Sequence, residues 1–456
     1  MLADAAAAAP TVAHHLRLFG LSASGAPTPQ SRAHVLVSSG PGTGALATVE
    51  ALGRRPMSVL LQPDARLLAT FGLTVIGDDP GPAVVHFPHL NDRPWARATS
   101  VHPVQTYQCA EPHEVIATDR QGRPCWVALR RNDGDVLIVG TNLGGDLVRY
   151  RQGDPARAAQ RTDGPMWGIP GERPIYLFDG QTAPGDEHER PADWWAIALA
   201  ETIATRLQQR LPPLLPHGAP GAIVVTGDDD QAYLEKYDEQ RVLLGDLPVT
   251  YFLHPLTRHT PPTLAAMMSR HTVELGLHPD ALDQPQRYTE RFREQAEWFH
   301  TLTGERATMV RNHGFLNDGY WGHLPIWLEQ DVRVSANLPG VDGRILNGSL
   351  LPARVAWDGE LTSHWSILTP IGDGVRFALG MDGPQSARCI SDLAVRIEQS
   401  GLPGVMVLNL HPQNVGDTRH MHAALHDVVA RGFVAMTLSQ CVDWFDARDR
   451  ALDGTA

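Results

Sequence analysis

From Ala222 to the C-terminus, strand-like and helix-like segments alternate, and this alternation limits the possible folds more than any other feature of the sequence. Short β-branched runs are separated by longer segments with helical spacing of apolar residues, such as Arg287–Leu302 and His420–Ala430. The strand candidates are Ala222–Thr226, Val249–Leu253, Val273–Leu277, Thr308–Asn312, Val332–Leu338, Val405–Leu410 and Phe433–Leu438. Seven strands with crossover helices predict a seven-stranded (β/α) barrel over residues 221–446, with a second open sheet as the alternative.

The preceding part of the chain also predicts an α/β fold, but of another kind. Its strand candidates are His34–Ser38, Ser58–Leu61, Leu73–Ile76, Ala83–Phe87 and Asp135–Gly140. Such nearly continuous apolar runs are typical of parallel strands that are buried on both faces. The segment Gly44–Leu52 fits a helix between the first two strands. We therefore predict a doubly wound, flavodoxin-like sheet over residues 33–185.

A proline-rich segment marks the boundary between these two parts. Ala192–Leu211 has the pattern of an amphipathic helix, and Leu211–Gly221 contains four prolines. Proline lacks the backbone N–H and fixes φ, so the helix cannot continue. We assign residues 186–220 to a helix and linker. Residues 1–32 are predicted to be a flexible tail, because their start is rich in alanine but lacks a secretory signal pattern, and residues 447–456 a second tail.

Composition excludes some classes of function. The net charge is −13, from 51 acidic and 38 basic residues, which disfavours binding to nucleic acid or to an anionic membrane surface. No apolar run approaches the roughly 20 residues that span a bilayer. The four scattered cysteines, Cys109, Cys125, Cys389 and Cys441, predict free thiols and a cytoplasmic protein. A homo-oligomer is compatible with these properties.

Polar residues follow four of the barrel strand candidates. They are the run Asp228-Asp229-Asp230, the pair His278 and Asp280, the segment Arg311-Asn312-His313, and His411. In a barrel the carboxyl ends of the strands meet on one face, where catalysis is usually housed. The three aspartates have an alternative role as helix caps. However, adjacent carboxylates repel one another, so their burial at a barrel mouth suggests a shared cation. One carboxylate and two imidazoles suit an open zinc site.

The order of these segments resembles the motifs of the polysaccharide deacetylase, or NodB-homology, family. The matching motifs are Thr226-Gly227-Asp228-Asp229, Glu274-Leu275-Gly276-Leu277-His278, Arg311 and Leu410-His411. The resemblance extends from about Gly221 to Asp446. It implies a hydrolase that removes an acetyl group from an N-acetylated sugar or glycoconjugate, using a divalent metal such as zinc.

The same resemblance implies individual roles. Asp228 matches the general base, and Arg311 matches the arginine that orients this base. His411 matches the histidine that protonates the leaving amine. Asp229 and His278 match two metal ligands. The chemistry is coherent, because a metal acidifies its water, Asp228 takes the proton and His411 returns one.

Two departures from the family pattern leave alternatives open. Leu282 stands where the family has its second metal histidine, and we expect His313 to supply this ligand, with Asp280 or Asp283 as weaker candidates. The Asp-x-x-Asp-Trp segment of the family is not recognisable. The alternatives are a non-catalytic carbohydrate-binding or regulatory protein on a degenerate barrel, and a hydrolase of another C–N bond, such as a cyclic amide or ureide.

A long segment with aromatic residues, from Gly343 to Trp365, has two interpretations. His364 and Trp365 are candidate substrate-binding residues, since sugars stack on aromatic faces. Alternatively, the segment is a structured insertion in which Trp357 and Trp365 pack in the interior.

The N-terminal part resembles the glutamine-amidotransferase-like domains that accompany some deacetylases. Neither Cys109 nor Cys125 lies in a nucleophile elbow, so this resemblance implies a domain without catalysis, with a role in shape, assembly or substrate presentation. The run Gly40-Pro41-Gly42-Thr43-Gly44 is compatible with a phosphate cradle. It matches neither the dinucleotide nor the P-loop spacing, so a plain turn is favoured.

Overall fold

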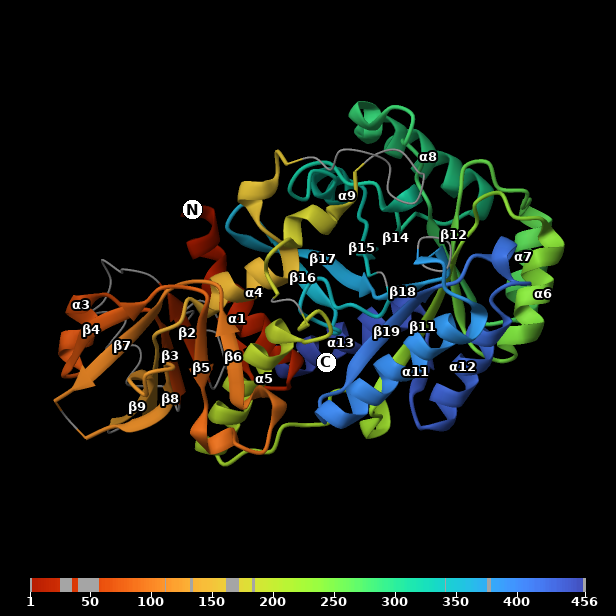
Figure 1. Ribbon diagram of the computed structural model, residues 1–456. Helices are drawn as coiled ribbons and strands as arrows, with labels where there is room; N and C mark the ends of the chain where they lie inside the picture. Colours follow the sequence, from red (N-terminus) through yellow and green to blue (C-terminus); the bar gives the residue numbers. More distant parts are fainter. Residues whose placement is uncertain are drawn as a thin grey trace.

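The computed structural model describes residues 2–24, 35–39, 57–110, 112–131, 134–160, 172–182, 185–340, 342–374 and 379–453. Two large β-sheets lie side by side, one built by the N-terminal half and one by the C-terminal half (Figure 1). The predicted glycine run 40–44 and the predicted helix 44–52 lie outside the described residues. None of the helices in the described ranges is long and apolar enough to cross a bilayer.

The N-terminal sheet has eight strands in the order β1-β2-β3-β10-β9-β8-β5-β6. Its strands are β1 (Ala23–Ser24), β2 (Val35–Ser39), β3 (Met57–Leu61), β5 (Ala83–His86), β6 (Arg97–Ser100), β8 (Glu114–Thr118), β9 (Pro124–Arg131) and β10 (Gly134–Val139). A separate antiparallel ribbon pairs β4 (Leu73–Asp79) with β7 (Val104–Cys109). The helices of this half are α1 (Leu2–Leu18), α3 (Ala65–Thr70) and α4 (Leu143–Gln152).

The N-terminal sheet is mixed, in contrast to the parallel doubly wound sheet that we predicted. All five predicted strands exist. Of these five, β2, β3 and β10 pair in parallel, whereas β4 and β5 pair antiparallel. Strands β9 and β10 follow each other closely along the chain, and such a short connection permits only antiparallel pairing. Apolar runs identify buried strands but do not reveal their direction, which is why the prediction was wrong in this respect.

The predicted N-terminal tail is a helix over residues 2–18. Val12 and Leu16 of α1 are fully buried, and the helix packs against strand β2 and helix α4. Arg17 forms an ion pair with Asp449 of α13 (Leu438–Asp453), which continues into the predicted C-terminal tail. The flexible-tail predictions are therefore wrong for residues 2–18 and 447–453. The apolar face of α1 is the physical reason, because it is buried against both halves of the molecule.

The predicted linker helix is also part of the core. Helix α5 (Pro191–Arg206) ends before the predicted Leu211 and is buried along almost its whole length. Asp193 on this helix accepts hydrogen bonds from the side chain of Ser349 and from the backbone N–H of Leu350. Its carboxylate also forms buried ion pairs with Arg151 and Arg190. Residues 191–206 therefore join the two halves.

The C-terminal sheet has ten strands, in the order β16-β17-β15-β14-β13-β12-β11-β19-β18, with β20 also paired to β11. The strands are β11 (Gly221–Asp228), β12 (Val249–Leu253), β13 (Val273–Leu277), β14 (Met309–Val310), β15 (Val334–Pro339), β16 (Ala353–Trp357), β17 (Glu360–Thr369), β18 (Ile371–Gly372), β19 (Gly404–Asn409) and β20 (Val434–Met436). All seven predicted strands are present, and β16, β17 and β18 are additional. The segment from Gly343 to Trp365 thus contributes to the sheet.

Strands β17 and β18 bring the two edges of this sheet together. Strand β17 pairs in parallel with β15 as far as Thr369, and β18 pairs in parallel with β19 from Ile371. The chain thus passes directly from β17, which lies next to the edge strand β16, into β18 at the opposite edge. The helices of this half are α6 (Leu234–Leu244), α7 (Pro261–Arg270), α8 (Tyr288–Thr303), α9 (Leu324–Glu329), α11 (Gly383–Ser400), α12 (Arg419–Ala430) and α13. They lie around the sheet, as expected for a (β/α) barrel (Figure 1).

Candidate active site

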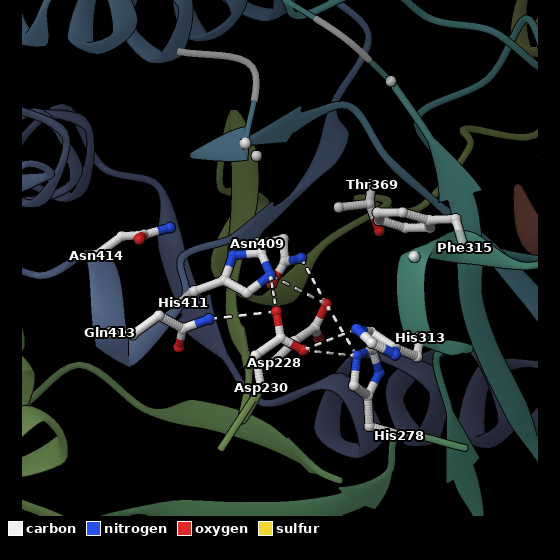
Figure 2. A pocket seen from close by; sticks show the side chains of 14 residues that line it. Asp228, Asp230, His278, His313, Phe315, Thr369, Asn409, His411, Gln413 and Asn414 are labelled. Carbon is white, nitrogen blue, oxygen red and sulfur yellow. Dashed lines mark hydrogen bonds and ion pairs between the residues drawn. The ribbon is translucent and has the colours of Figure 1, made fainter. Parts of the chain in front are cut away.

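A cavity of about 300 Å³ opens at the carboxyl ends of the barrel strands (Figure 2). It is lined by Asp228, Asp230, His278, His313, Gly314, Phe315, Gly340, Thr369, Gly372, Gly374, Asn409, His411, Gln413 and Asn414. These residues lie at or just after the carboxyl ends of β11, β13, β14, β15, β17, β18 and β19. The structure therefore brings together the strand-end residues that the sequence predicted to converge.

Asp228 is the most tightly held carboxylate of the cavity. It is almost fully buried at the end of β11. Its Oδ1 accepts a hydrogen bond of 2.9 Å from Nη1 of Arg311, and its Oδ2 accepts one of 2.7 Å from Nδ2 of Asn409. Burial raises the pKa of Asp228, but the positive charges of Arg311, His278 and His411 lower it by more than burial raises it. The net pKa of Asp228 is therefore below its usual value. Asp228 is ionised at neutral pH.

Arg311 is fixed from several strands. Besides Asp228, its guanidinium donates to Oγ1 of Thr226, to the backbone oxygen of Ala336 and to Oγ1 of Thr369. The side chain is fully buried, so each of these acceptors replaces water that the cation would otherwise bind. The predicted orienting contact between Arg311 and Asp228 is present in the structure.

Asp230, His278 and His313 form a cluster of possible metal ligands. One atom from each residue lies within 4.8 Å of the others. Oδ1 of Asp230 is 3.3 Å from Nε2 of His278 and 3.6 Å from Nε2 of His313. Ligand distances of about 2.0–2.2 Å in a tetrahedral zinc site place neighbouring ligand atoms about 3.3–3.6 Å apart. The two distances from Asp230 match this requirement.

The hydrogen bond of the His278 ring leaves Nε2 as the nitrogen that can bind a metal. Its Nδ1 lies 2.6 Å from the backbone oxygen of Arg311, which can only accept, so Nδ1 carries a proton. Nε2 of His278 and Oδ1 of Asp230 are buried and lie 3.3 Å apart, and neither atom makes a hydrogen bond of good geometry among the described residues. Buried polar atoms without partners are costly, and a shared cation would satisfy both. The donor set of one carboxylate and two imidazoles therefore fits a divalent metal such as zinc.

His411 faces this cluster from the other side of the cavity. Its Nε2 lies 3.4 Å from Oδ2 of Asp230 and 3.7 Å from Oδ2 of Asp228, and its Nδ1 lies 2.5 Å from Oδ1 of Asp373. Burial lowers the pKa of His411, but the surrounding carboxylates, led by Asp373, outweigh this effect and raise it to about 10. The ring is therefore an imidazolium at neutral pH and can donate a proton from Nε2.

The structure does not bring Asp229 into the cluster, in contrast to its predicted role as a metal ligand. The side chain of Asp229 is fully buried, and its Oδ1 accepts a hydrogen bond of 2.6 Å from the hydroxyl of Tyr237 on α6. Successive side chains of a strand point in opposite directions, so Asp228 faces the cavity and Asp229 faces the helix layer. Asp230, which we expected to cap a helix, turns back into the cavity with a positive φ of 35°.

His364 and Trp365 are not substrate-binding residues in this structure. Both are almost fully buried in β17. The ring nitrogens of His364 lie 2.9 Å from the backbone oxygen of Val332 and 2.9 Å from Oγ of Ser335. Trp365 donates its indole N–H to Asp446 of α13. The packing alternative is thus correct for Trp365, because its polar atom finds a partner inside the protein.

The structure distinguishes between His313, Asp280 and Asp283 as candidates for the metal ligand that replaces the family's second histidine. His313 joins the cluster as expected. Asp283 is exposed and pairs with Arg291, whereas Asp280 lies beside His313 without facing Asp230. Leu282, at the position of the family's histidine, packs against the barrel core.

The motifs in the sequence assign no chemical role to three functional candidates, Asp230, Asp373 and Asn409. Asn409 precedes Leu410-His411 and ends β19, so its strand-end position was a usable signal. Asp373 follows β18, a strand of two residues that leaves no recognisable pattern.

Comparisons with known proteins give partial likenesses only. No protein-family model and no curated protein matches the sequence. A candidate polysaccharide deacetylase from Mycobacterium smegmatis is similar in structure, with a TM-score of 0.40 and 17% identity over 51% of this chain and 93% of the other. A candidate polysaccharide deacetylase involved in O-antigen biosynthesis from Bordetella bronchiseptica has a TM-score of 0.32 and 18% identity, over 52% and 93%.

A CE4 family pseudoenzyme from Bacillus anthracis is similar at a TM-score of 0.33 and 10% identity, over 49% of this chain and 65% of the other. The resemblance of residues 33–185 to amidotransferase-like domains has no support from these comparisons. The scores are low, and the function of the chain has to be argued from its own residues.

Proposed function

We propose that the chain is a metal-dependent hydrolase of amide-type C–N bonds, and that it removes the acetyl group from an N-acetylated sugar or glycoconjugate. One observation carries this proposal. A ligand cluster of Asp230, His278 and His313 shares a cavity with the ionised Asp228 and with the imidazolium of His411. These are the groups that metal-assisted amide hydrolysis uses: a metal position, a proton acceptor and a proton donor.

The residues of the chain divide the proton transfers between them. When bound, a divalent ion would supply Lewis-acid polarisation of the amide oxygen and would acidify water. Arg311 and Asn409 orient Asp228, whose lowered pKa keeps it ready to accept a proton from the attacking water. His411 donates its Nε2 proton to the amine nitrogen as the C–N bond breaks. Asp373 holds Nδ1 of His411 and stabilises the cation until that step.

Metal content and acetate release from N-acetylated sugars test the proposal. We expect about one zinc or similar ion per chain, release of acetate, and loss of turnover after treatment with EDTA that is restored by added metal. Asp228→Asn and His411→Ala should each lower kcat by about 10²–10⁴-fold, the usual contribution of a general base or acid. Full activity in EDTA would contradict the proposal. Hydrolysis of cyclic amides or ureides, with no acetate released, would identify another C–N hydrolase.

A further inference from the structure

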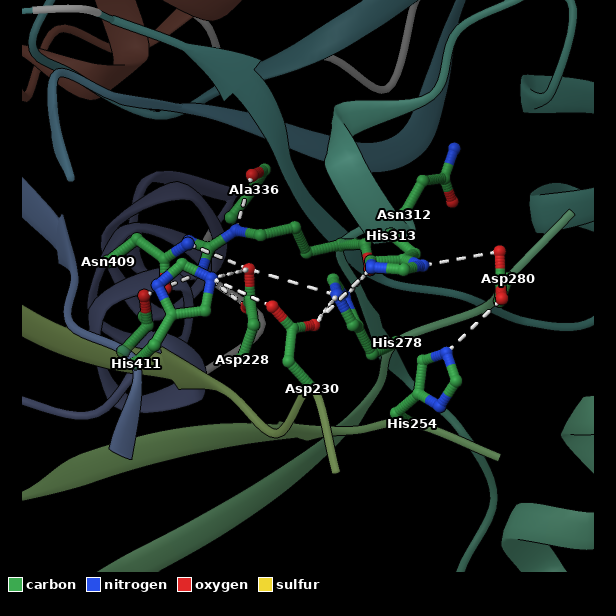
Figure 3. A network of polar contacts seen from close by, with 12 residues as sticks. Asp228, Asp230, His254, His278, Asp280, Asn312, His313, Ala336, Asn409 and His411 are labelled. Atoms are coloured by element: carbon green, nitrogen blue, oxygen red, sulfur yellow. Dashed lines mark hydrogen bonds and ion pairs between the residues drawn. The ribbon is translucent and has the colours of Figure 1, made fainter. Parts of the chain in front are cut away.

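A second group of polar side chains adjoins the ligand cluster on the far side of His313. It consists of His254, Asp280 and His313 itself (Figure 3). Oδ2 of Asp280 lies 3.3 Å from Nε2 of His254, and Oδ1 lies 3.2 Å from Nδ1 of His313. This geometry is compatible with two roles. The group could hold a second cation, or it could position His313 for the first.

The hydrogen bonds of His254 distinguish between these roles. Its Nδ1 accepts a hydrogen bond of 3.1 Å from the backbone N–H of Leu256, so Nδ1 carries no proton. The proton of the neutral ring is then on Nε2, the atom that faces Asp280. A nitrogen that carries a proton cannot bind a metal. His254 is 2% exposed, so its ring is held in this environment. His254 therefore donates to Asp280 and does not complete a second metal site.

The same reasoning assigns the proton of His313. Nδ1 of His313 lies 3.2 Å from Oδ1 of Asp280, closer than Nε2 lies to Oδ1 of Asp230 at 3.6 Å. No hydrogen bond of good geometry to Nδ1 is formed among the described residues, but a carboxylate can only accept, so the shorter contact favours the proton on Nδ1. Nε2 of His313 then presents its lone pair towards Asp230 and His278. The neighbouring ligand follows the same rule with a different partner, since Nδ1 of His278 faces a backbone oxygen. Both imidazoles offer Nε2 to one position.

Asp280 is itself held rigidly. Its Oδ1 accepts a hydrogen bond of 3.0 Å from the backbone N–H of Leu282. The side-chain amide of Gln295, on α8, accepts from the backbone N–H of Asp280 and donates to its backbone oxygen, at 2.8 Å each. The backbone N–H of His313 also donates to Pro279 at 2.9 Å. The carboxylate is therefore fixed relative to His313 without any metal.

We propose that Asp280 and His254 are a positioning pair that fixes the tautomer and ring orientation of His313 for metal binding. This inference rests on the proposed function, because it assigns a metal to Asp230, His278 and His313. Partners of metal-bound histidines commonly act in this way, and their loss typically weakens metal affinity by about 10–100-fold. Asp280 and His254 touch neither metal nor substrate in this arrangement.

The test is zinc affinity, measured by competition with a chromophoric chelator. We expect zinc to bind Asp280→Asn about 10–100-fold more weakly than the wild type, because an amide oxygen cannot accept from both imidazoles and carries no charge. Asp283→Asn is the matched control, since Asp283 is exposed, pairs with Arg291 and should leave the affinity unchanged. Equal affinities for the two variants would overturn the inference.

A second measurement keeps the inference testable if Asp280→Asn does not fold. Metal analysis of zinc-loaded wild type should give one zinc per chain. In the same protein labelled with [15N]histidine, NMR should show a proton on Nδ1 of His313 and an unligated His254 with its proton on Nε2. Two zinc ions per chain with His254 ligated would overturn the positioning role and establish a second site. Wild type that binds no zinc would contradict the proposed function itself, and the inference with it.

Discussion

Nδ1 of His411 lies 2.5 Å from Oδ1 of Asp373, and the two residues follow the paired strands β19 and β18. Oδ2 of Asp373 also accepts hydrogen bonds from the backbone N–H of His411 and from Nδ2 of Asn414. One carboxylate thus fixes both the ring and its loop. A histidine held in this way keeps its proton on Nδ1 and presents Nε2 to the cavity, as a general acid must.

Replacement of Asp373 by Asn should therefore impair catalysis without removing the metal. We expect kcat for an N-acetylated sugar to fall by about 10²–10⁴-fold, because the amide does not stabilise the imidazolium. KM and zinc content should change little. The exposed Asp358, in the turn between β16 and β17, gives a matched control, and Asp358→Asn should behave as wild type. An unchanged kcat in Asp373→Asn would remove His411 from the role of acid.

Asp229 and Asp230 provide a direct test of which carboxylate binds the metal. Asp230→Asn removes the anionic ligand. The zinc affinity of this variant should therefore fall by more than the roughly 10–100-fold that follows loss of a hydrogen-bond partner of a metal ligand. Asp229→Asn keeps an oxygen that can accept from Tyr237 and should retain one zinc per chain. Zinc analysis after dialysis measures both. The opposite result would restore the ligand assignment implied by the family resemblance.

The contrast between Asp229 and Asp230 shows what the sequence could predict of this site. The strand ends were predictable, because apolar runs locate buried strands and polar residues follow them. The direction of each aspartate was not, because it depends on where β11 ends and on the positive φ of Asp230, a local turn without a glycine or asparagine to signal it. The motif assigns the ligand role to Asp229, whereas the aspartate that lines the cavity beside His278 is Asp230.

The same distinction between local pattern and tertiary packing holds for the fold. The barrel strands were predicted because each is an apolar run that ends at a turn or a polar residue. The alanine-rich segment of α1 has only a weak helical stripe, and its burial depends largely on α4 and α13, which lie far away in sequence. For a similar reason the sequence leaves both a substrate-binding and a packing interpretation open for His364 and Trp365, since aromatic residues alone do not reveal which surface covers them.

Buried neutral histidines should make the protein sensitive to acid. Burial lowers the pKa of His323 to about 3, whereas an unfolded histidine has a pKa near 6.5. The unfolded state therefore binds more protons, and this contribution to stability, complete above pH 6.5, is lost as the pH falls towards 3. At pH 5 the loss is about 2 kcal/mol for this residue.

Urea unfolding of the metal-free protein at pH 7 and pH 5 measures the acid sensitivity. The pH-dependent change in the free energy of unfolding should be smaller by about 2 kcal/mol in His323→Gln than in wild type. Comparison of the two changes cancels the packing cost of the substitution itself. An identical pH dependence in both proteins would show that His323 is not held neutral.

The stability of the interface between the N-terminal and C-terminal halves should depend strongly on Asp193. Its fully buried carboxylate accepts from Ser349 and the backbone of Leu350, and it pairs with Arg151 and Arg190. Asp193→Ala would leave two buried guanidinium groups without their anion, so the free energy of unfolding should fall by about 3–5 kcal/mol.

Asp331→Asn is the matched control for this prediction. Asp331 pairs with Arg306 at the exposed surface, so its loss should change the free energy of unfolding by less than about 1 kcal/mol. Denaturant unfolding monitored by tryptophan fluorescence reports on both variants, since Trp195 lies on the same helix as Asp193. Should Asp193→Ala be as stable as Asp331→Asn, then packing of α1 and α5 alone, without the buried ion pairs, would hold the two halves together.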